Sequence, residues 1–256
     1  FLGSASATII GGSIAYLASW RMVYLVYGVG ELILALIMLQ YLEKDKGVRE
    51  HLELGKSYKV ALSNFRFMRL VVLLFFIGFS VLGTFTYVGI SAMNKTGYSI
   101  LVVGFMLSSY GFGTVFGGKI ASKLKVKLGS SFLAVAGLIG FASLLLLSYT
   151  SNVPLIVLSL FGFGLSFIFM QSTLVTTLQL MLPTMKGTVM SLTSFNIFFG
   201  AAVGTSLNAK ILEVSNMDQV YLLAGTIIAV VGVLSSIYVS KFESAGMKEM
   251  KQKKFA

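Results

Sequence analysis

The sequence predicts an all-α integral membrane protein, and three observations lead to this prediction. Of the 256 residues, 56% are hydrophobic and only 11% are charged, and the mean hydropathy is +0.89. A soluble domain carries about twice that share of charged residues, so too few charges remain to cover a surface that faces water. Apolar stretches of about 20 residues, the length of a helix that crosses a bilayer, recur along the chain. No stretch alternates polar and apolar residues as the strands of a membrane β-barrel do.

Eight stretches are long and apolar enough to be spanning helices. No residue from Gly129 to Met185 is charged, but this run is too long for one helix. The polar sequence TSNVP at 150–154 divides it into two, and Pro154 suits the first turn of the second helix. We place the spans at 1–18, 22–42, 69–92, 98–118, 129–149, 154–181, 187–210 and 219–240.

The basic residues are distributed unevenly between alternate loops. Arg21, Lys95 and Lys210 lie on one side of the predicted spans, and the other 17 of the 20 Lys and Arg residues lie on the opposite side. Basic residues collect in cytoplasmic loops, so we expect the linker after the second span and the C-terminal tail to be cytoplasmic. This distribution explains the net charge of +11 without a nucleic-acid partner. For the tail, we favour a topological anchor over binding to anionic lipid.

These features divide the chain into four parts. Residues 1–42 form two spans, 43–68 a charged cytoplasmic linker, 69–240 a six-helix bundle, and 241–256 a basic cytoplasmic tail. This layout resembles the Major Facilitator Superfamily, whose members have two six-helix halves joined by a long cytoplasmic loop. The resemblance implies that the chain carries helices 5 and 6 and the complete C-terminal half. The chain starts at Phe1, and we expect the other helices of the N-terminal half to precede it.

Three local patterns support the resemblance. The segment GSASATIIGGSIAYLASWR resembles the family's glycine-rich antiporter pattern, although Ala7 and Thr8 stand where that pattern has Gly-Pro. The segment LPTMKGTVMSLTSFNIFFGAAVGTSL resembles the turn between helices 10 and 11. The segment GKIASKLKVK resembles the loop between helices 8 and 9, which locks the cytoplasmic gate through charges. Gly118, Lys123 and Lys127 fit this gate loop, but Ser122 replaces its acid, so we expect a weak lock or a role in orientation alone.

The resemblance implies a secondary active transporter that works by alternating access about a site near the middle of the membrane. We expect it to move a small organic solute across the plasma membrane, with proton-coupled efflux suggested by a similarity to drug-proton exporters. The alternative is a non-transporting receptor or scaffold with the same helices. The expected partners are the lipid bilayer, the solute, protons and the N-terminal half; no cofactor is expected.

Polar residues that share a helix face are the candidates for lining a substrate cavity, since polar atoms that face lipid would be unsatisfied. We select them at 100° per residue and note that small hydroxyls also join helices by hydrogen bonds. Gln171 points away from the face selected in its helix, and we assign it to a neighbouring helix. For Asn196, we favour a contact between helices over substrate binding, because Gly200 and Gly204 share its face. The candidates are Ser80, Thr84, Tyr87, Ser166, Thr173, Thr177 and Asn196.

Glu31 is the most unusual residue of the predicted spans. It lies near the middle of its span, where an ionised carboxylate costs several kcal/mol. It is therefore the candidate proton site, but helix 6 of the family packs outside the cavity. For that reason we favour a protonated acid hydrogen-bonded to a neighbouring helix.

Other chemistries find little support. The chain has no cysteine, and its only histidine, His51, lies in the charged linker without a second ligand. We therefore predict no metal site. No pairing of a nucleophile with a base appears within the membrane, so we predict no enzyme activity.

Overall fold

The computed structural model describes residues 2–42 and 54–254, and these residues form helices and short connections without a strand. Two short elements interrupt the α-helices: a π-helical turn, η1 (Gly78–Leu82), and a 3-10 turn, η2 (Gly129–Ser131). The helices are α1 (Leu2–Leu17), α2 (Trp20–Tyr41), α3 (Leu54–Ser63), α4 (Phe65–Ile77), α5 (Gly83–Thr96), α6 (Ile100–Leu128), α7 (Phe132–Tyr149), α8 (Val153–Met181), α9 (Lys186–Val214) and α10 (Met217–Lys254).

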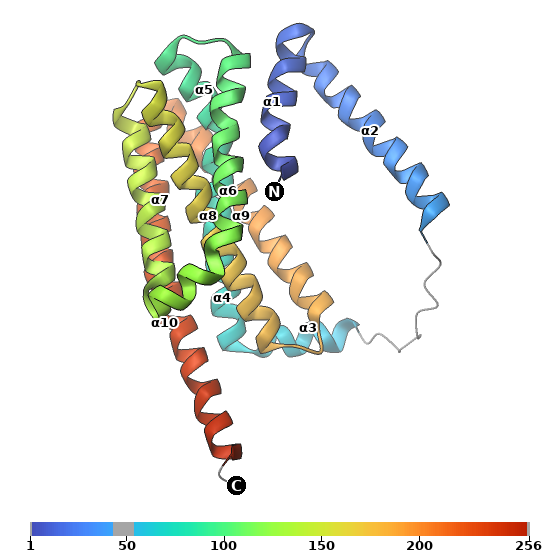
Figure 1. The fold of residues 1–256 in the computed structure, drawn as a ribbon, viewed down its shortest axis with the longest axis vertical. Coiled ribbons are helices and arrows are strands. Elements are labelled where there is room, and N and C mark those ends of the chain that lie inside the picture. The colour runs from blue at the N-terminus through green and yellow to red at the C-terminus, as the bar shows by residue number, and fades with distance from the viewer. Residues whose placement is uncertain (1, 43–53, 255–256) are drawn as a thin grey trace.

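The helices α4 to α10 form one bundle (Figure 1). In it, α7 packs against α8 and α10, α6 packs against α8, and α9 packs against α4, η1 and α5. We call the end of the bundle that carries α3 the linker end, and the end with the α5–α6 turn the far end (Figure 1). The bundle is filled by large apolar side chains, among them Phe67, Leu74, Phe163, Leu174 and Ile228.

Glycines allow the closest approaches between these helices. A Cβ atom on Gly113 of α6 would lie 3.2 Å from the Cα of Phe161 in α8. On α9, a Cβ on Gly200 would lie 2.9 Å from the Phe75 carbonyl carbon, and one on Gly204 would lie 3.0 Å from the Phe79 Cα. The expectation that Gly200 and Gly204 mark a close helix contact is therefore confirmed.

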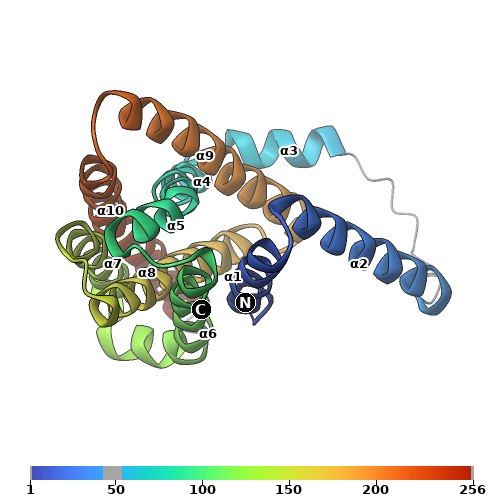
Figure 2. The ribbon, with the colours of Figure 1, turned by 90° about the horizontal axis from the view of Figure 1, so that it is seen from above.

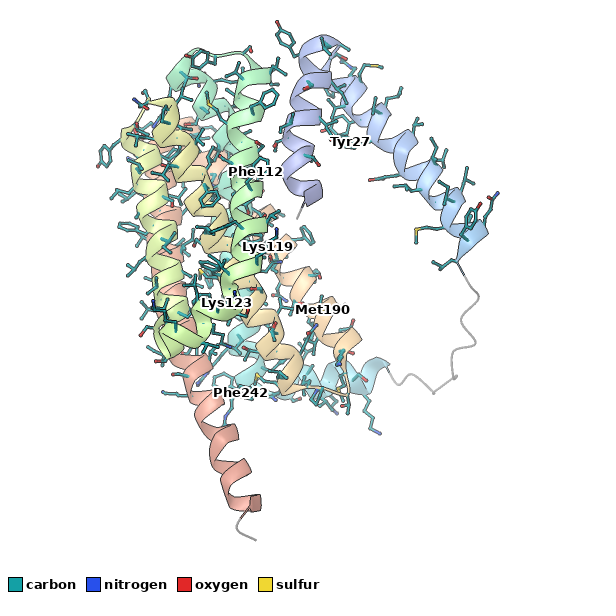
Figure 3. All side chains as sticks on the ribbon, viewed as in Figure 1. Tyr27, Phe112, Lys119, Lys123, Met190 and Phe242 are labelled. Atoms are coloured by element: carbon teal, nitrogen blue, oxygen red, sulfur yellow. The ribbon has the colours of Figure 1, made fainter. Side chains whose placement is uncertain are left out.

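The first two helices differ in how they meet the bundle. α1 packs along α6, whereas α2 runs away from both (Figures 1 and 2). No residue of α2 is buried, although the helix is apolar. Tyr27 provides one tie between the two helices, because its hydroxyl donates to the Ala7 carbonyl at 3.2 Å (Figure 3).

Part of the linker is helical, which corrects the prediction of a loop over 43–68. Helix α3 lies across the linker end of the bundle (Figure 1), and the Tyr58 hydroxyl lies 2.8 Å from the Ser191 hydroxyl of α9. The next helix starts at Phe65, four residues before the predicted start, because the Asn64 side chain accepts the Phe67 amide at 3.2 Å and caps it. Residues 43–53, with His51, lie outside the described residues.

Two further segments are more helical than predicted. The 119–127 segment is not a loop, because α6 continues to Leu128. The tail is not separate from the last span, because α10 runs on to Lys254 and leaves the bundle (Figure 1). The 119–127 segment lacks the Gly or Pro that would end a helix, and the one glycine of the tail, Gly246, lies within α10 without ending it. The backbone hydrogen bonds therefore continue past the apolar stretch in both segments.

Six segments among the described residues are long and apolar enough to cross a membrane. One of them, Ile100–Tyr149, folds back on itself as α6 and α7. The shorter apolar helix Ser6–Leu17 lies within α1. Seven of the eight predicted spans thus fall largely on a single α-helix, and the span 69–92 falls on the continuous run of α4, η1 and α5. That the chain crosses a bilayer eight times stays a prediction.

Candidate functional site

A cavity of about 280 Å³ lies where α1 meets α5 and α6. Apart from the hydroxyls of Thr8 and Thr86, its walls are apolar side chains and glycines. Small residues of α1 form one wall, and the other two helices supply larger side chains. The lining residues are Ala7, Thr8, Gly11, Gly12, Thr86, Gly89, Ile90, Met93, Ile100, Val103, Gly104 and Leu107.

Glycines bring α1 and α6 together beside this cavity. A Cβ on Gly104 would lie 2.8 Å from the Thr8 carbonyl oxygen, and a Cβ on Gly12 would lie 3.2 Å from the Ile100 carbonyl oxygen. Because the nearest atoms belong to backbone, a larger residue at Gly104 would push the two helices apart. Of the glycines of the first helix, Gly12 therefore packs against α6, whereas a Cβ on Gly11 would meet Val23 of α2 and one on Gly3 would meet nothing within 4 Å.

A seam of polar side chains joins α5 to α9. The Tyr87 hydroxyl donates to the Thr205 carbonyl at 3.0 Å, and the Asn208 amide nitrogen lies 3.4 Å from the Thr84 hydroxyl. The hydroxyls of Thr86 and Thr205 lie 3.4 Å apart. Thr86 also lines the cavity, so the seam reaches the cavity at that residue.

The predicted candidates of this segment therefore lie in a helix contact. Thr84 is fully buried and Tyr87 partly buried. Ser80 is fully buried in the π-helical turn, and its hydroxyl has no hydrogen-bond partner among the described residues. Hydrogen bonds between α5 and α9 favour the packing alternative for Thr84 and Tyr87.

The candidates on α8 also face neighbouring helices. Ser166 is buried against Gly140 of α7. The Thr177 hydroxyl donates to the Thr173 carbonyl in its own helix at 2.8 Å. Thr173 borders a small crevice together with Ser236 of α10. All three are buried, which favours helix packing for them as well.

A second polar face of α8 escaped the sequence analysis. Ser172, Thr176 and Gln179 lie about 100° around the helix from the selected candidates, and they are half-buried or exposed. The Gln179 amide nitrogen lies 3.0 Å from the Met190 sulfur of α9, and Figure 3 shows Met190 near the linker end. Polar residues recur once per turn on this face only in the last turns of α8, so the sequence carries a weak signal for it.

Asn196 and Gln171 lie at different kinds of position. The Asn196 amide donates to the Leu192 carbonyl of its own helix at 2.8 Å, so it makes no cross-helix bond through that nitrogen. The Gln171 carbonyl oxygen is buried and has no hydrogen-bond partner among the described residues.

Glu31 lies halfway along α2 and is exposed. No described residue forms a hydrogen bond or ion pair with its carboxylate, so the predicted bond to a neighbouring helix is not among the contacts of the structure. Its roles as a proton site or a structural acid both stay predictions.

Gly118, Lys123 and Lys127 lie on the last turns of α6, and all three are exposed. Figure 3 shows Lys119 and Lys123 on the part of α6 near the linker end. The described side chains include no carboxylate that pairs with Lys123 or Lys127, and the role of the gate loop stays a prediction.

The far end holds a cluster that the sequence analysis missed. The Lys95 ammonium group donates to the carbonyls of Leu147 and Ser148 at 2.7 and 2.6 Å, and it lies 3.6 Å from the Asp218 carboxylate. The Ser148 hydroxyl donates to the same carboxylate at 2.8 Å. Lys95 thereby caps the C-terminus of α7 and ties α5 and α10 to it. Residues so far apart in sequence carry no local signal of such a cluster.

The described part of the chain contains no group of three His, Cys, Asp or Glu residues placed to hold a metal ion. The arrangement offers instead an apolar cavity with a few hydroxyls, beside a contact between helices from either side of the linker. This cavity provides space for a small molecule between α1, α5 and α6.

A comparison with models of known protein families agrees with this fold. No curated protein sequence matches the chain. The family model described as Major Facilitator Superfamily matches residues 1–205, which include α1 to α8 and most of α9. The chain belongs to the Major Facilitator Superfamily, a family of membrane transporters.

Proposed function

We propose that the protein is a secondary active transporter that moves a small organic solute by alternating access. The observation that carries this proposal is the glycine contact between α1 and α6, with a cavity beside it. α1 precedes the linker, whereas α6 belongs to the bundle that follows it. Alternating access requires two bundles that rock about a shared site. The α1–α6 contact lies between the part of the chain before the linker and the bundle after it.

The cavity indicates the class of solute. Its walls carry no charged side chain, and Thr8 and Thr86 are the polar residues among them. A charged solute would lose its hydration there without a compensating partner. A largely apolar organic molecule, held by contacts with Ile90, Met93 and Leu107, suits this site best.

The distribution of basic residues supports an orientation. The linker end carries Arg66, Arg69, Lys123 and Lys186, whereas the far end carries Lys95 and Lys210. With the linker end in the cytoplasm, the α1–α6 contact lies toward the outer side. The proposal includes this orientation in the plasma membrane and eight crossings of the bilayer. It also includes efflux of the solute coupled to protons.

A flux assay on the protein in liposomes tests the proposal. We expect saturable, gradient-dependent movement of at least one compound from a panel of small apolar solutes. Gly104→Ala should lower that flux roughly tenfold, since an overpacked contact typically costs about 1–3 kcal/mol and the new Cβ would lie 2.8 Å from the Thr8 carbonyl oxygen.

The matched control is Gly187→Ala, because a Cβ on Gly187 meets nothing within 4 Å. Equal flux for Gly104→Ala and the control would contradict a role of the α1–α6 contact. No gradient-dependent flux of any compound by the unaltered protein would contradict transport and favour a receptor or scaffold.

A further inference from the structure

A groove at the surface of the bundle runs between α4 and α10, on the side away from α1 and α2 (Figure 2). Its volume is about 480 Å³, within the range of sites that bind small ligands. Its floor consists of apolar side chains such as Leu73 and Val231, while Val72, Phe76 and Val230 at its edges are exposed. The groove therefore suits an aliphatic chain.

A second cavity, of about 300 Å³, continues the groove at the linker end. The two cavities share Arg69 and Tyr238, and the second also contains Arg66 and Lys241. Figure 3 shows its Phe242 at the foot of the bundle, where α10 leaves it. Three cationic side chains thus gather at one end of an apolar groove.

The structure holds Arg69 in place without neutralising it. Its guanidinium carbon lies 4.1 Å from the centre of the Phe65 ring and 5.4 Å from that of Tyr238. The carboxylates among the described side chains are Glu31, Glu213 and Asp218, which lie on α2 or at the far end. None of the residues that line the second cavity is acidic, so no carboxylate among the described side chains neutralises the three cations.

We infer that the α4–α10 groove binds an anionic phospholipid, with its phosphate among Arg66, Arg69 and Lys241 and an acyl chain along the groove. Arg side chains bind phosphate through paired hydrogen bonds, and basic pockets between helices bind lipid headgroups. Tyr238 lies between the cationic and apolar parts, as aromatic residues do at the membrane interface. A free phosphate would leave the apolar groove empty, and an apolar solute would leave the three cations unpaired.

The site lies apart from the α1–α6 cavity, and its test does not depend on transport. The purified protein is titrated with phosphatidylglycerol or with phosphatidylcholine of the same acyl chains, and bound lipid is counted by native mass spectrometry. We expect phosphatidylglycerol to be retained preferentially. In the triple variant Arg66→Gln/Arg69→Gln/Lys241→Gln, binding should weaken about fivefold for each cation removed, or roughly a hundredfold.

The matched control, Lys119→Gln/Lys123→Gln/Lys186→Gln, removes three exposed cations from the same end of the bundle and should retain the lipid as the unaltered protein does. Equal retention by both triple variants, or equal loss from both, would overturn the site. Arg69→Lys keeps the charge and should retain most of the binding, and the thermal unfolding midpoint of the triple variant shows whether that variant folds.

The groove itself is tested by Val230→Trp, which fills it without changing a charge. We expect Val230→Trp to lower phosphatidylglycerol retention, whereas Leu138→Trp, on the exposed face of α7, should not. Unchanged retention in Val230→Trp would overturn the proposal, and so would displacement of the lipid by millimolar inorganic phosphate. A third contradicting outcome is that the unaltered protein is a dimer and Val230→Trp abolishes it, because a second copy would then occupy the groove.

Discussion

At the scale of single residues, two ionisable side chains of this largely apolar chain, Lys95 and Glu31, differ in whether they have partners. Lys95 donates to two carbonyls at the end of α7 and lies 3.6 Å from Asp218. Glu31 stands exposed in the middle of α2 without a described partner. Lys95 therefore stabilises the packing of α5, α7 and α10, whereas Glu31 makes no described contact that would stabilise the fold.

We expect Lys95→Met to lower the stability of the far end by about 1–2 kcal/mol, since hydrogen bonds to charged groups contribute about 1.5–3 kcal/mol and Lys95 is partly exposed. The measurement is the midpoint of thermal unfolding in detergent. Lys210→Met is the control, because Lys210 is exposed near the same end. Equal midpoints for the two variants would show that the cluster contributes nothing to stability.

We expect Glu31→Gln to fold like the unaltered protein, because the change keeps the side chain's shape and no described contact is lost. A proton-carrying role predicts that the variant loses transport or its pH dependence in the liposome assay, while Glu213→Gln, at the end of α9, keeps both. A variant that retains the rate and the pH profile would rule this role out.

At the scale of helices, glycines decide which surfaces meet. α6 contacts α8 through Gly113 and α1 through Gly104, so one helix serves two close contacts. On α9, Gly200 and Gly204 lie against Phe75 and Phe79, and the polar seam of α5 and α9 continues the same contact. Polar residues that share a helix face can therefore belong to a contact between helices, and periodicity cannot distinguish such a contact from a cavity.

Gly204→Ala should destabilise the bundle by about 1–3 kcal/mol, the usual cost of overpacking, because the new Cβ would lie 3.0 Å from the Phe79 Cα. Thermal unfolding measures the effect. Gly118→Ala, where a Cβ meets nothing within 4 Å, should unfold at the temperature of the unaltered protein or above it. A Gly204→Ala midpoint equal to that of Gly118→Ala would mean that η1 and α9 are not in such close contact.

At the scale of the whole molecule, the α1–α6 contact joins the part before the linker to the bundle after it. The cavity lies at this contact, while the α4–α10 groove lies on the other side of the bundle (Figure 2). The proposed solute and the proposed lipid thus occupy different faces, and each can be tested alone.

The orientation in the membrane can be tested directly, because the sequence has no cysteine and single cysteines can be added without background. We expect a membrane-impermeant maleimide to label Asn94→Cys on intact cells, and Lys123→Cys only after permeabilisation. Both residues are exposed, one at the far end and the other near the linker end. The reverse pattern would contradict a cytoplasmic linker.

The sequence alone predicted the helices well, since apolar length and the polar sequence between residues 150 and 154 are local properties. The predicted spans 129–149 and 154–181 became α7 (Phe132–Tyr149) and α8 (Val153–Met181). The loops were predicted less well: the 119–127 segment is helical, and so is α3 in the linker. Charge marks the end of an apolar stretch, but a helix ends where its backbone hydrogen bonds end.

What the sequence by itself determined is the class of protein, the identity of its helices and its family, all of which follow from composition and order along the chain. Only the tertiary structure decided which faces of those helices meet. Ser166 faces α7 and Tyr87 bonds to α9, while Arg66, Arg69 and Lys241 converge from two helices far apart in sequence. The physical reason is that burial and pairing depend on neighbours brought together by packing, which no local pattern records.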